Sequence, residues 1–357
     1  MNALESQLDY PFAETLPAPG TAIDVAPGIR WARMRLPFAL DHVNVWLLRD
    51  HSDHSDAEPG RPGWTIVDTG IDDAPTRADW EQLFATALDG LPVLRLVVTH
   101  MHPDHIGLAH WICARWNVRL WISAADYNVA RVASSASAGF GGPLSASFMA
   151  AHGMVDPIAV REVGERKSYY RGLVPALPQT YRRLLDGLDL RIGGTSWHCH
   201  VGFGHAPEHM ALHDASGSVL VSGDMVLPRI STNVSVIDVE PEADPLTLYL
   251  ESIERMRAID AGVLVLPSHG RPFKGLHTRI DQLRDHHEER FAEVLKACAE
   301  APLSAFDLVP VLFKRRLDLH QMTFAIGESI AHCHALWHVG RLRRTLCADG
   351  VFRFAVA

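Results

Sequence analysis

The chain has 357 residues and a formal net charge of −9, with 47% hydrophobic and 21% charged residues. This composition excludes a largely disordered chain, and the acidic balance argues against a protein built mainly to hold nucleic acid phosphates. The length predicts one large domain and a smaller one. The cysteines are scattered without paired spacing and predict no disulfide framework. No stretch has the pattern of a signal peptide or a membrane span, so a cytoplasmic location without membrane contact is expected.

The predicted elements begin after a Pro-rich leader over residues 1–27. Strands are predicted within 30–49 and at 64–68, separated by a polar loop that contains Pro and Gly. Helical spacing follows at 74–88. Residues 94–98 are then a short apolar run, which is typical of a strand buried on both faces.

The middle of the chain alternates between helices and strands around one irregular stretch. Helices at 107–116 and 123–132 flank a strand at 119–122. Residues 134–182 are rich in Gly, Ser, Ala, Pro and aromatic residues without clear periodicity, and we predict an insertion or lid there. The later predicted elements are strands at 188–201, 210–222 and 262–266, and helices at 245–259 and 276–299.

The pattern changes near residue 301. Two short helical patterns precede 322–337, where apolar residues recur at helical spacing, and an Asp349-Gly350 turn signals a final hairpin. Helices followed by a short hairpin predict a winged-helix-like domain over 301–357. The larger domain is then expected to span 28–300.

Four potential metal ligands lie within six residues, directly after the buried strand at 94–98. They are His100, His102, Asp104 and His105. Alternation along the chain places His100 and His102 on one side, and the turn at Pro103 swings the other two toward a second position nearby. Imidazole combined with carboxylate suits zinc, and also iron or manganese.

Three later segments each place one further ligand after a predicted strand. The ligands are His205, Asp224 and His269, and each stands beside a glycine that lets the backbone turn. One metal ion needs about four ligands, so the first cluster alone leaves two positions unfinished. The three later residues complete both positions.

These four segments, in this order, resemble the metallo-β-lactamase superfamily over roughly residues 28–275. The resemblance implies an α/β fold, an αββα sandwich of two sheets covered by helices, with two divalent metal ions, zinc being the metal expected. It also implies that Asp68, in Val67-Asp68-Thr69-Gly70, supports a ligand from behind, although a turn residue at a strand end looks the same. The implied ligands of one metal are His100, His102 and His205, those of the other are Asp104, His105 and His269, and Asp224 bridges the two.

The resemblance narrows the chemistry. His102 in place of Glu disfavours the flavodiiron oxygen reductases, and Asp224 in place of Cys disfavours the Cys-containing zinc β-lactamases. A glyoxalase II-like, lactonase-like or RNase Z-like site remains. We expect a hydrolase in which a metal-bridging hydroxide attacks a small carbonyl substrate, a thioester or lactone, while Asp104 orients that hydroxide or passes its proton to the leaving group.

Two other activities stay open. Residues 302–357 carry seven basic and four acidic side chains, a formal charge of +3, and resemble a C-terminal domain found in superfamily members that cut single-stranded RNA or hydrolyse acyl thioesters. RNA is therefore a possible partner, less expected than a small molecule, and a homo-oligomer is also open. The third hypothesis is a mononuclear iron dioxygenase acting on a persulfide, with fewer ligands.

Several polar and aromatic residues keep two interpretations. Glu208 either faces outward as a salt-bridge partner or reaches the substrate. The aromatic residues Phe140, Phe148, Tyr169 and Tyr170 either line an acyl pocket or form the core of the insertion. Its basic residues either clamp an anionic group or form a solvated helix face; they are Arg161, Arg166, Lys167, Arg171, Arg182 and Arg183.

The remaining histidines are expected to be surface or packed side chains rather than ligands. His198 and His200 share one face of a predicted strand, and His287 is expected on a helix surface. Three others lie on the last predicted helix; they are His332, His334 and His338.

Overall fold

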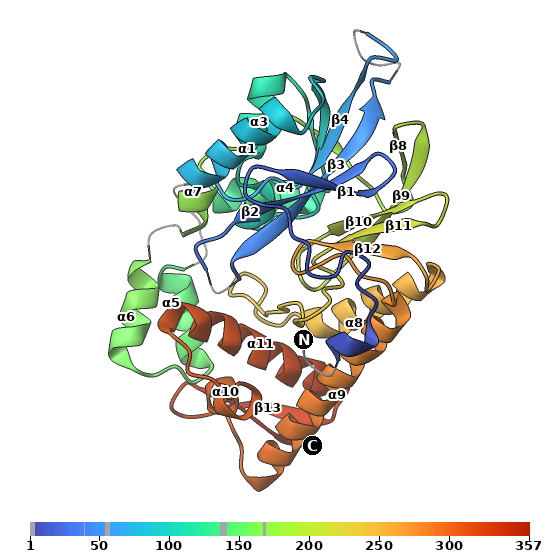
Figure 1. The fold of residues 1–357 in the computed structure, drawn as a ribbon. Coiled ribbons are helices and arrows are strands. Elements are labelled where there is room, and N and C mark those ends of the chain that lie inside the picture. Colours follow the sequence, from blue (N-terminus) through green and yellow to red (C-terminus); the bar gives the residue numbers. More distant parts are fainter. Residues whose placement is uncertain (1–3, 39, 54–57, 136–140, 167–168) are drawn as a thin grey trace.

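Two β-sheets packed face to face form the centre of the fold (Figure 1). The computed structural model describes residues 4–38, 40–53, 58–135, 141–166 and 169–357. Helices cover the outer face of each sheet, which gives the layer order helix, sheet, sheet, helix. The αββα sandwich implied by the resemblance is thus confirmed.

The first sheet has its strands side by side in chain order. β1 to β4 are antiparallel to one another, and β4 to β7 are parallel. β1 lies inside the predicted leader, since it pairs with β2 through Ala22 and Ala32. The strands are β1 (Ala22–Ala26), β2 (Ile29–Arg35), β3 (His42–His51), β4 (Pro62–Val67), β5 (Val93–Val97), β6 (Leu120–Ile122) and β7 (Tyr181–Arg183).

The second sheet has the order β12-β11-β10-β9-β8. Only β11 and β12 are parallel, and the other neighbours are antiparallel. The strands are β8 (Asp189–Ile192), β9 (Thr195–Gly202), β10 (His209–Asp214), β11 (Val219–Gly223) and β12 (Leu264–Pro267).

Two predicted strands prove to be hairpins. Residues 188–201 divide into β8 and β9 at Gly193, which has a φ of +61° and packs so closely on the carbonyl oxygen of Arg49 that a Cβ would lie 2.3 Å from it. Residues 210–222 divide into β10 and β11 at a turn where the Asp214 carboxylate accepts hydrogen bonds from backbone N–H groups. Apolar residues alternate on both sides of each turn, so the sequence pattern did not reveal where one strand ends and the next begins.

Large side chains fill the space between the two sheets. Trp31 and Trp46 stack with ring centroids 6.2 Å apart, and both are buried together with Trp197 of the facing sheet. Burying such side chains contributes about 1.5–3 kcal/mol each. This packing holds the ends of the two sheets at a fixed separation, which matters because the candidate ligands stand there.

Helices on the first sheet pack over its outer face, and α8 and α9 pack over that of the second. Side-chain caps set several starts, since Asp73, Ser123 and Asp244 each accept a hydrogen bond from the first turn of the helix that follows. These helices are α1 (Ala74–Thr86), α2 (Pro103–Ile106), α3 (Ala109–Trp116), α4 (Ala124–Ala133), α8 (Pro245–Arg255) and α9 (Leu276–Glu300), with short 3-10 turns at Glu5–Gln7 and Met256–Ala258.

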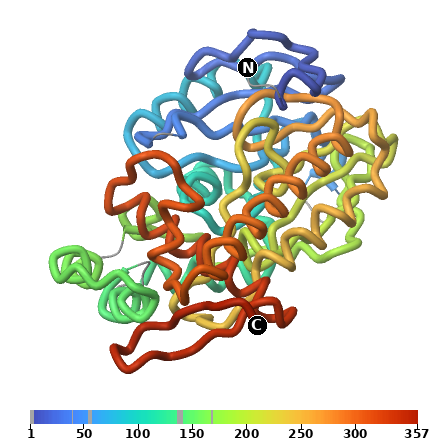
Figure 2. Tube along the Cα trace, turned by 90° about the horizontal axis from the view of Figure 1, so that it is seen from below, coloured from blue at the N-terminus to red at the C-terminus, as the bar shows by residue number. Residues whose placement is uncertain are grey.

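The predicted insertion contains helices, irregular segments and the start of β7 in its described part. It contains α5 (Pro143–Ala151), α6 (Pro157–Glu165) and α7 (Tyr169–Leu173). Figure 2 shows α5 and α6, in green, beside the red C-terminal segment. The backbone N–H of Phe306 donates to the carbonyl oxygen of His152, which joins the two parts.

The C-terminal segment contains α10 (Ala305–Leu312), α11 (Leu319–His338) and a hairpin of β13 (Leu342–Leu346) and β14 (Phe352–Val356). One helix, not two, precedes α11 in this described stretch. Helices followed by a hairpin match the predicted order, while the winged-helix assignment and the domain boundaries stay predictions. In the described part of the chain, no helix is both long and apolar enough to cross a bilayer.

Candidate metal centre

The candidate ligands gather because parallel neighbouring strands end at the same edge of a sheet. β4 and β5 are parallel, so Asp68, which follows β4, lies beside the loop of His100. β11 and β12 are parallel as well, and they are followed by Asp224 and His269. His205 follows β9 in the same sheet. The seven predicted ligands thus meet where the two sheets end together.

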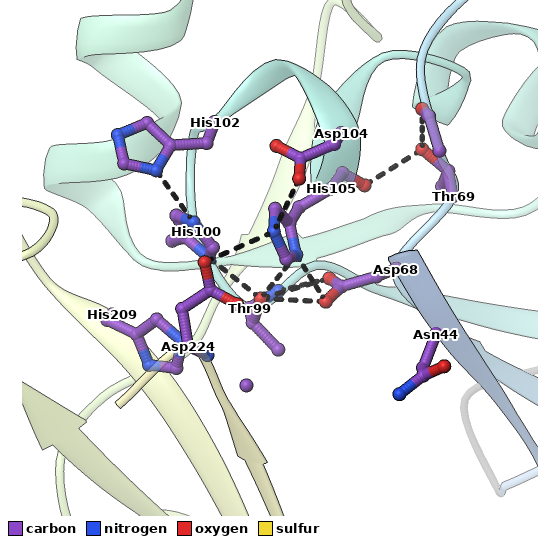
Figure 3. Close-up of polar contacts among 12 residues, drawn as sticks. Asn44, Asp68, Thr69, Thr99, His100, His102, Asp104, His105, His209 and Asp224 are labelled. Carbon is purple, nitrogen blue, oxygen red and sulfur yellow. Dashed lines mark hydrogen bonds and ion pairs between the residues drawn. The ribbon is translucent and has the colours of Figure 1, made fainter. Parts of the chain in front are cut away.

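Three histidine rings form the first ligand group, and Figure 3 labels two of them, His100 and His102. The Nε2 atom of His100 lies 3.0 Å from Nδ1 of His102 and 3.2 Å from Nε2 of His205, and the last two nitrogens lie 3.0 Å apart. Nitrogens that share one tetrahedral metal at about 2.0–2.1 Å are about 3.3 Å apart. The three rings therefore have the spacing of a metal-binding tripod.

A second group combines Asp104, His105 and His269. The Oδ2 atom of Asp104 lies 3.4 Å from Nε2 of His105 and 3.4 Å from Nε2 of His269. Asp224 stands between the two groups, because its Oδ2 lies 3.2 Å from Nε2 of His205 and its Oδ1 lies 3.4 Å from Nε2 of His269. The arrangement is the one expected of a bridging carboxylate, and the ligand assignment itself stays a prediction.

Buried polar atoms in this cluster fit a pair of divalent cations. Nε2 of His105 and Oδ1 of Asp224 are buried and make no hydrogen bond to any described residue. Leaving such atoms unpaired costs about 1–3 kcal/mol each, more for charged groups. Imidazole and carboxylate donors converge here from four loops, so the residues present suit zinc, iron or manganese.

Histidines of the two ligand groups have pKa values that are shifted in opposite directions. Burial, and then the charge of His205, lowers the pKa of His102 to about 3, so its ring is neutral and its nitrogen free to bind a metal. Burial also acts to lower the pKa of His269, but Asp224 and Asp104 outweigh it and raise that pKa to about 10. The two carboxylates therefore favour positive charge at this point, which divalent ions supply without protons.

Asp68 orients His105 from behind, as the resemblance implies. Its Oδ2 atom lies 2.8 Å from Nδ1 of His105, and its Oδ1 accepts the backbone N–H of Thr99 at 2.8 Å. A carboxylate only accepts hydrogen bonds when ionised, so Nδ1 carries the proton and Nε2 faces the second ligand group. Asp68 itself has a φ of +64°, a conformation that Asp adopts more readily than most residues.

Backbone carbonyls orient two further rings in the same way. Nδ1 of His205 donates to the carbonyl oxygen of Asn233 at 2.7 Å, and Nδ1 of His269 donates to that of His42 at 2.7 Å. In the neutral form of each ring this hydrogen bond keeps the proton on Nδ1, so that Nε2, which faces the ligand groups, can bind a metal ion.

Asp126 is a site residue that the sequence analysis missed. Its Oδ1 accepts the backbone N–H of Met101 at 2.8 Å, and its Oδ2 accepts that of Glu208 at 2.7 Å. One carboxylate thus fastens two ligand loops together, and burial raises its pKa to about 6. The signal in the sequence was a Ser123-x-x-Asp126 helix start after a strand, which looks like an ordinary cap.

His209 was also missed. Its Nε2 atom accepts the backbone N–H of Asp224 at 3.0 Å, so it positions the segment that carries the Asp224 carboxylate. A Cβ on Gly223 would lie 2.2 Å from that same nitrogen, and Gly223 has a φ of +56°. Only glycine allows this approach without displacing the histidine.

Three residues near these loops, whose roles the sequence left undecided, make the following contacts. Glu208 is partly exposed, and its Oε2 accepts the backbone N–H of Ala125 at 3.4 Å, in the first turn of α4, so both interpretations of this residue stay open. His198 is 44% exposed and lies 3.1 Å from Asp189. His198 and His200 belong to none of the three potential ligand groups among the described residues.

The prediction that His287 lies on a helix surface is wrong. It is fully buried, with Nδ1 3.1 Å from Nε2 of His332, because this side of α9 packs against α11. His332 and His334 are packed side chains, as expected. His338 lies near the surface, 3.0 Å from the carbonyl oxygen of Glu242.

The aromatic and basic residues of the insertion differ in how deeply they are buried. Phe148 is buried, and so is Tyr170, whose hydroxyl donates to the carbonyl oxygen of Met101. Tyr169 is half-buried. Arg161, Arg171 and Arg183 are exposed, and the Arg182 guanidinium lies 4.9 Å from the Trp121 ring. Phe140 and Lys167 lie outside the described residues.

Two curated relatives have sequences similar to that of this chain. A protein named probable metallo-hydrolase YqjP, from Bacillus subtilis, is 25% identical over 313 residues, which cover 85% of this chain and 90% of that protein. A linear primary-alkylsulfatase from a Pseudomonas species is 25% identical over 246 residues, 62% of this chain and only 42% of the relative.

Solved structures match along the whole chain. A β-lactamase domain protein from Burkholderia ambifaria is 54% identical with a TM-score of 0.92, and all of both chains is covered. A metallo-β-lactamase family protein from Thermus thermophilus is 25% identical with a TM-score of 0.74, covering 94% of this chain and 100% of that one.

Family models agree with these likenesses. The model described as the C-terminal domain of metallo-beta-lactamase-like proteins matches residues 291–357. The model described as the metallo-beta-lactamase superfamily matches residues 40–269, which include all seven candidate ligands and Asp68. The chain belongs to the metallo-β-lactamase superfamily.

Proposed function

We propose that this protein is a dinuclear, zinc-dependent hydrolase of a small carbonyl substrate, a thioester, lactone or related ester. The observation that carries the proposal is the position of Asp224, within 3.2–3.7 Å of His205, His269 and His105 and so shared by both ligand groups. Divalent ions held there would activate water near neutral pH and polarise a carbonyl oxygen.

Asp104 has the role of orienting water and accepting its proton. Its side chain is 19% exposed, more than those of His105, His205, Asp224 or His269, so it meets incoming water and substrate. Its Oδ2 is held between His105 and His269, which leaves the rest of the carboxylate able to accept a proton from water and deliver it to the leaving group.

The likeness to the linear primary-alkylsulfatase supports a second candidate, hydrolysis of a sulfate ester. The same ligand groups suit an attack on sulfur as well as on carbon. RNA cleavage is less favoured, because Arg344 is engaged inside the C-terminal segment, with its guanidinium 3.9 Å from the Trp337 ring and an ion pair to Glu242. A mononuclear iron dioxygenase is less favoured because a second group, Asp104, His105 and His269, could hold another metal ion.

The deciding experiment combines metal analysis with a substrate panel on one purified sample. We expect two zinc ions per chain and turnover of thioesters or lactones that stops when a chelator removes the metal. Alkyl sulfate turnover alone would transfer the proposal to the second candidate. One iron per chain with oxygen consumption, or cleavage of single-stranded RNA alone, would overturn both.

A further inference from the structure

The ligand cluster is accessible from one side. Asp104 and His102 are only partly buried, whereas the side chains of His105, His269 and Asp224 are 0–9% exposed. Figure 3 shows His102 and Asp104 at the same margin of the cluster, away from Asp68 and His209. A substrate therefore reaches the two ligand groups from the side of Asp104.

Tyr169 lies on this accessible side. α7 is held against the ligand loop by the hydrogen bond from the Tyr170 hydroxyl to the carbonyl oxygen of Met101. Burial, and then the charge of the Asp104 carboxylate, raises the pKa of the Tyr169 phenol to about 12. α7 also contacts α2, the short helix that contains Asp104, so Tyr169 stands close to that carboxylate.

Rings from two other segments join Tyr169. Its ring centroid lies 6.4 Å from that of Phe38, in the loop between β2 and β3, and 5.1 Å from that of His320, at the start of α11. His320 in turn lies 5.1 Å from Phe324. Phe38 is 37% exposed and Phe324 is 47% exposed. We call these four rings the aromatic rim.

A cation lies beside the aromatic rim. Arg166, which follows α6, donates a hydrogen bond from Nη1 to Oγ1 of Thr323 at 3.4 Å, and Thr323 is the residue before Phe324. Burial is the largest cause of the pKa shift of each ring. The positive charge of Arg166 acts to lower the pKa of His320, and it also acts to lower that of Tyr169 against the larger effects of burial and Asp104. No ion pair of Arg166 is found among the residues that the structure describes.

We propose that the aromatic rim and Arg166 form a subsite for the part of the substrate that does not react, a flat aromatic group carrying one carboxylate. Aromatic faces favour stacking with a second ring, and a guanidinium pairs with a carboxylate through two parallel hydrogen bonds. The subsite rests on the proposed function for its reacting bond. It assigns α7 and the N-terminal turn of α11 to substrate selection.

Two matched esters test the charge preference. The acetate esters of 4-hydroxyphenylacetate and 4-hydroxyphenylacetamide differ only in a distal carboxylate or amide, and both release a phenol that absorbance detects. In the metal-loaded protein, Arg166→Gln should lower kcat/KM for the carboxylate ester at least about tenfold and leave the amide ester nearly unchanged, as expected for a lost charge-assisted hydrogen bond. Equal effects on both esters would refute the role of Arg166.

Two further variants separate the rim from general damage. Tyr169→Leu removes a ring of the aromatic rim, and we expect it to raise KM for both esters with little change in kcat. Arg161→Gln changes an exposed basic residue of α6 and should alter neither ester. Melting temperatures show that all variants are folded. Loss with Arg161→Gln equal to that with Arg166→Gln would mean that only the surface charge matters, which overturns the subsite.

Equilibrium binding keeps the subsite separate from the proposed function. Calorimetry with 4-hydroxyphenylacetate and 4-hydroxyphenylacetamide compares the metal-loaded wild type with Arg166→Gln. Tighter binding of the carboxylate that disappears in Arg166→Gln supports the subsite even if no ester is hydrolysed, and only the proposed function then fails. Ester hydrolysis that does not depend on Arg166 would instead overturn the subsite and leave the proposed function standing.

Discussion

At the scale of single residues, the ligands depend on partners that never touch the metal. Asp68 sets the ring of His105, carbonyl oxygens set His205 and His269, and Asp126 ties two ligand loops together. Each partner lies far from its ligand in the sequence. Because an imidazole has two nitrogens and rotates freely, these hydrogen bonds decide which nitrogen points at the ligand groups.

Asp68→Ala should lower zinc affinity at the second ligand group by about 10–100-fold, the usual effect of removing a partner that orients a metal-binding histidine. The measurement is zinc retained per chain in competition with a chelator of known affinity. Asp79→Ala is the control, since Asp79 is equally a buried carboxylate but pairs with Arg35 away from the cluster. Retention of both zinc ions by Asp68→Ala would show that His105 needs no such orientation.

At the scale of elements, α11 supports the first ligand group through the segment 233–236, which we call the strap. Glu328 on α11 accepts the side-chain N–H of Asn233 at 3.1 Å, and the carbonyl oxygen of Asn233 accepts the proton of His205. The strap is also bonded at Val236, whose N–H donates to the carbonyl oxygen of Gly327. Figure 1 shows α11 passing beneath the sandwich at this point.

Glu328→Ala should therefore weaken zinc binding at the first ligand group. Burial raises the pKa of Glu328 to about 7, so the lost hydrogen bond is worth about 0.5–3 kcal/mol, depending on the charge of the carboxyl group. Its loss should also loosen the Asn233 carbonyl that orients His205. Chelator competition and the absorption spectrum of the cobalt-substituted protein measure the effect. Glu328→Gln still accepts the hydrogen bond from Asn233 and should bind zinc like the wild type. Glu242→Ala should leave zinc binding unchanged, since Glu242 pairs with Arg344 near the surface. An unchanged cobalt spectrum in Glu328→Ala would contradict the link.

The junction of α9 and α11 contains a buried histidine pair that makes stability depend on pH. Burial, and then neighbouring charges, lowers the pKa of His332 to about 4 and that of His287 to about 2. The folded state therefore keeps both rings neutral, while the unfolded chain binds protons below about pH 6.5. Their contribution to stability is complete above pH 6.5 and is lost as the pH falls toward 4.

His332→Gln should reduce this loss. Between pH 7.5 and pH 5.5, one such histidine costs the wild type about 1.4 kcal/mol of unfolding free energy, a cost that the variant avoids. Urea unfolding at the two pH values measures it. His198→Gln serves as the control, because His198 is largely exposed. Equal decreases in wild type and His332→Gln would mean that the pair titrates normally when folded.

At the scale of the whole molecule, the ligand groups connect the two sheets. The first sheet contributes the loop from His100 to His105, and the second contributes His205, Asp224 and His269. A metal ion bound between them would link the two sheets, and any ligand that binds only the folded state stabilises that state.

Metal removal should consequently lower the melting temperature of the whole chain. With free zinc at a hundred times its dissociation constant, the stabilisation is about 2.7 kcal/mol for each site. Calorimetry before and after chelation measures it, and re-addition of zinc should restore the first value. A melting temperature that is independent of zinc would show that the cluster binds no metal of consequence to folding.

Short-range chemistry in the sequence was sufficient for the ligand types and the fold class. The spacing from His100 to His105 after an apolar run, and single ligands beside glycines, predicted the cluster that the structure assembles. Helices with clear spacing, such as α1 and α9, also lie where the periodicity predicted them. These features depend on residues that are neighbours along the chain.

Only the tertiary structure decided which residues orient the ligands and which are hidden. Asp126, His209 and the Glu328–Asn233 contact act across separations of up to 95 residues, so no local pattern reveals them. The burial of His287 likewise depends on α11, more than 40 residues away. Which residues can bind a metal follows from their side-chain chemistry, which the sequence states directly. Side-chain orientation and burial arise only when distant segments pack together, so no short stretch of sequence predicts them.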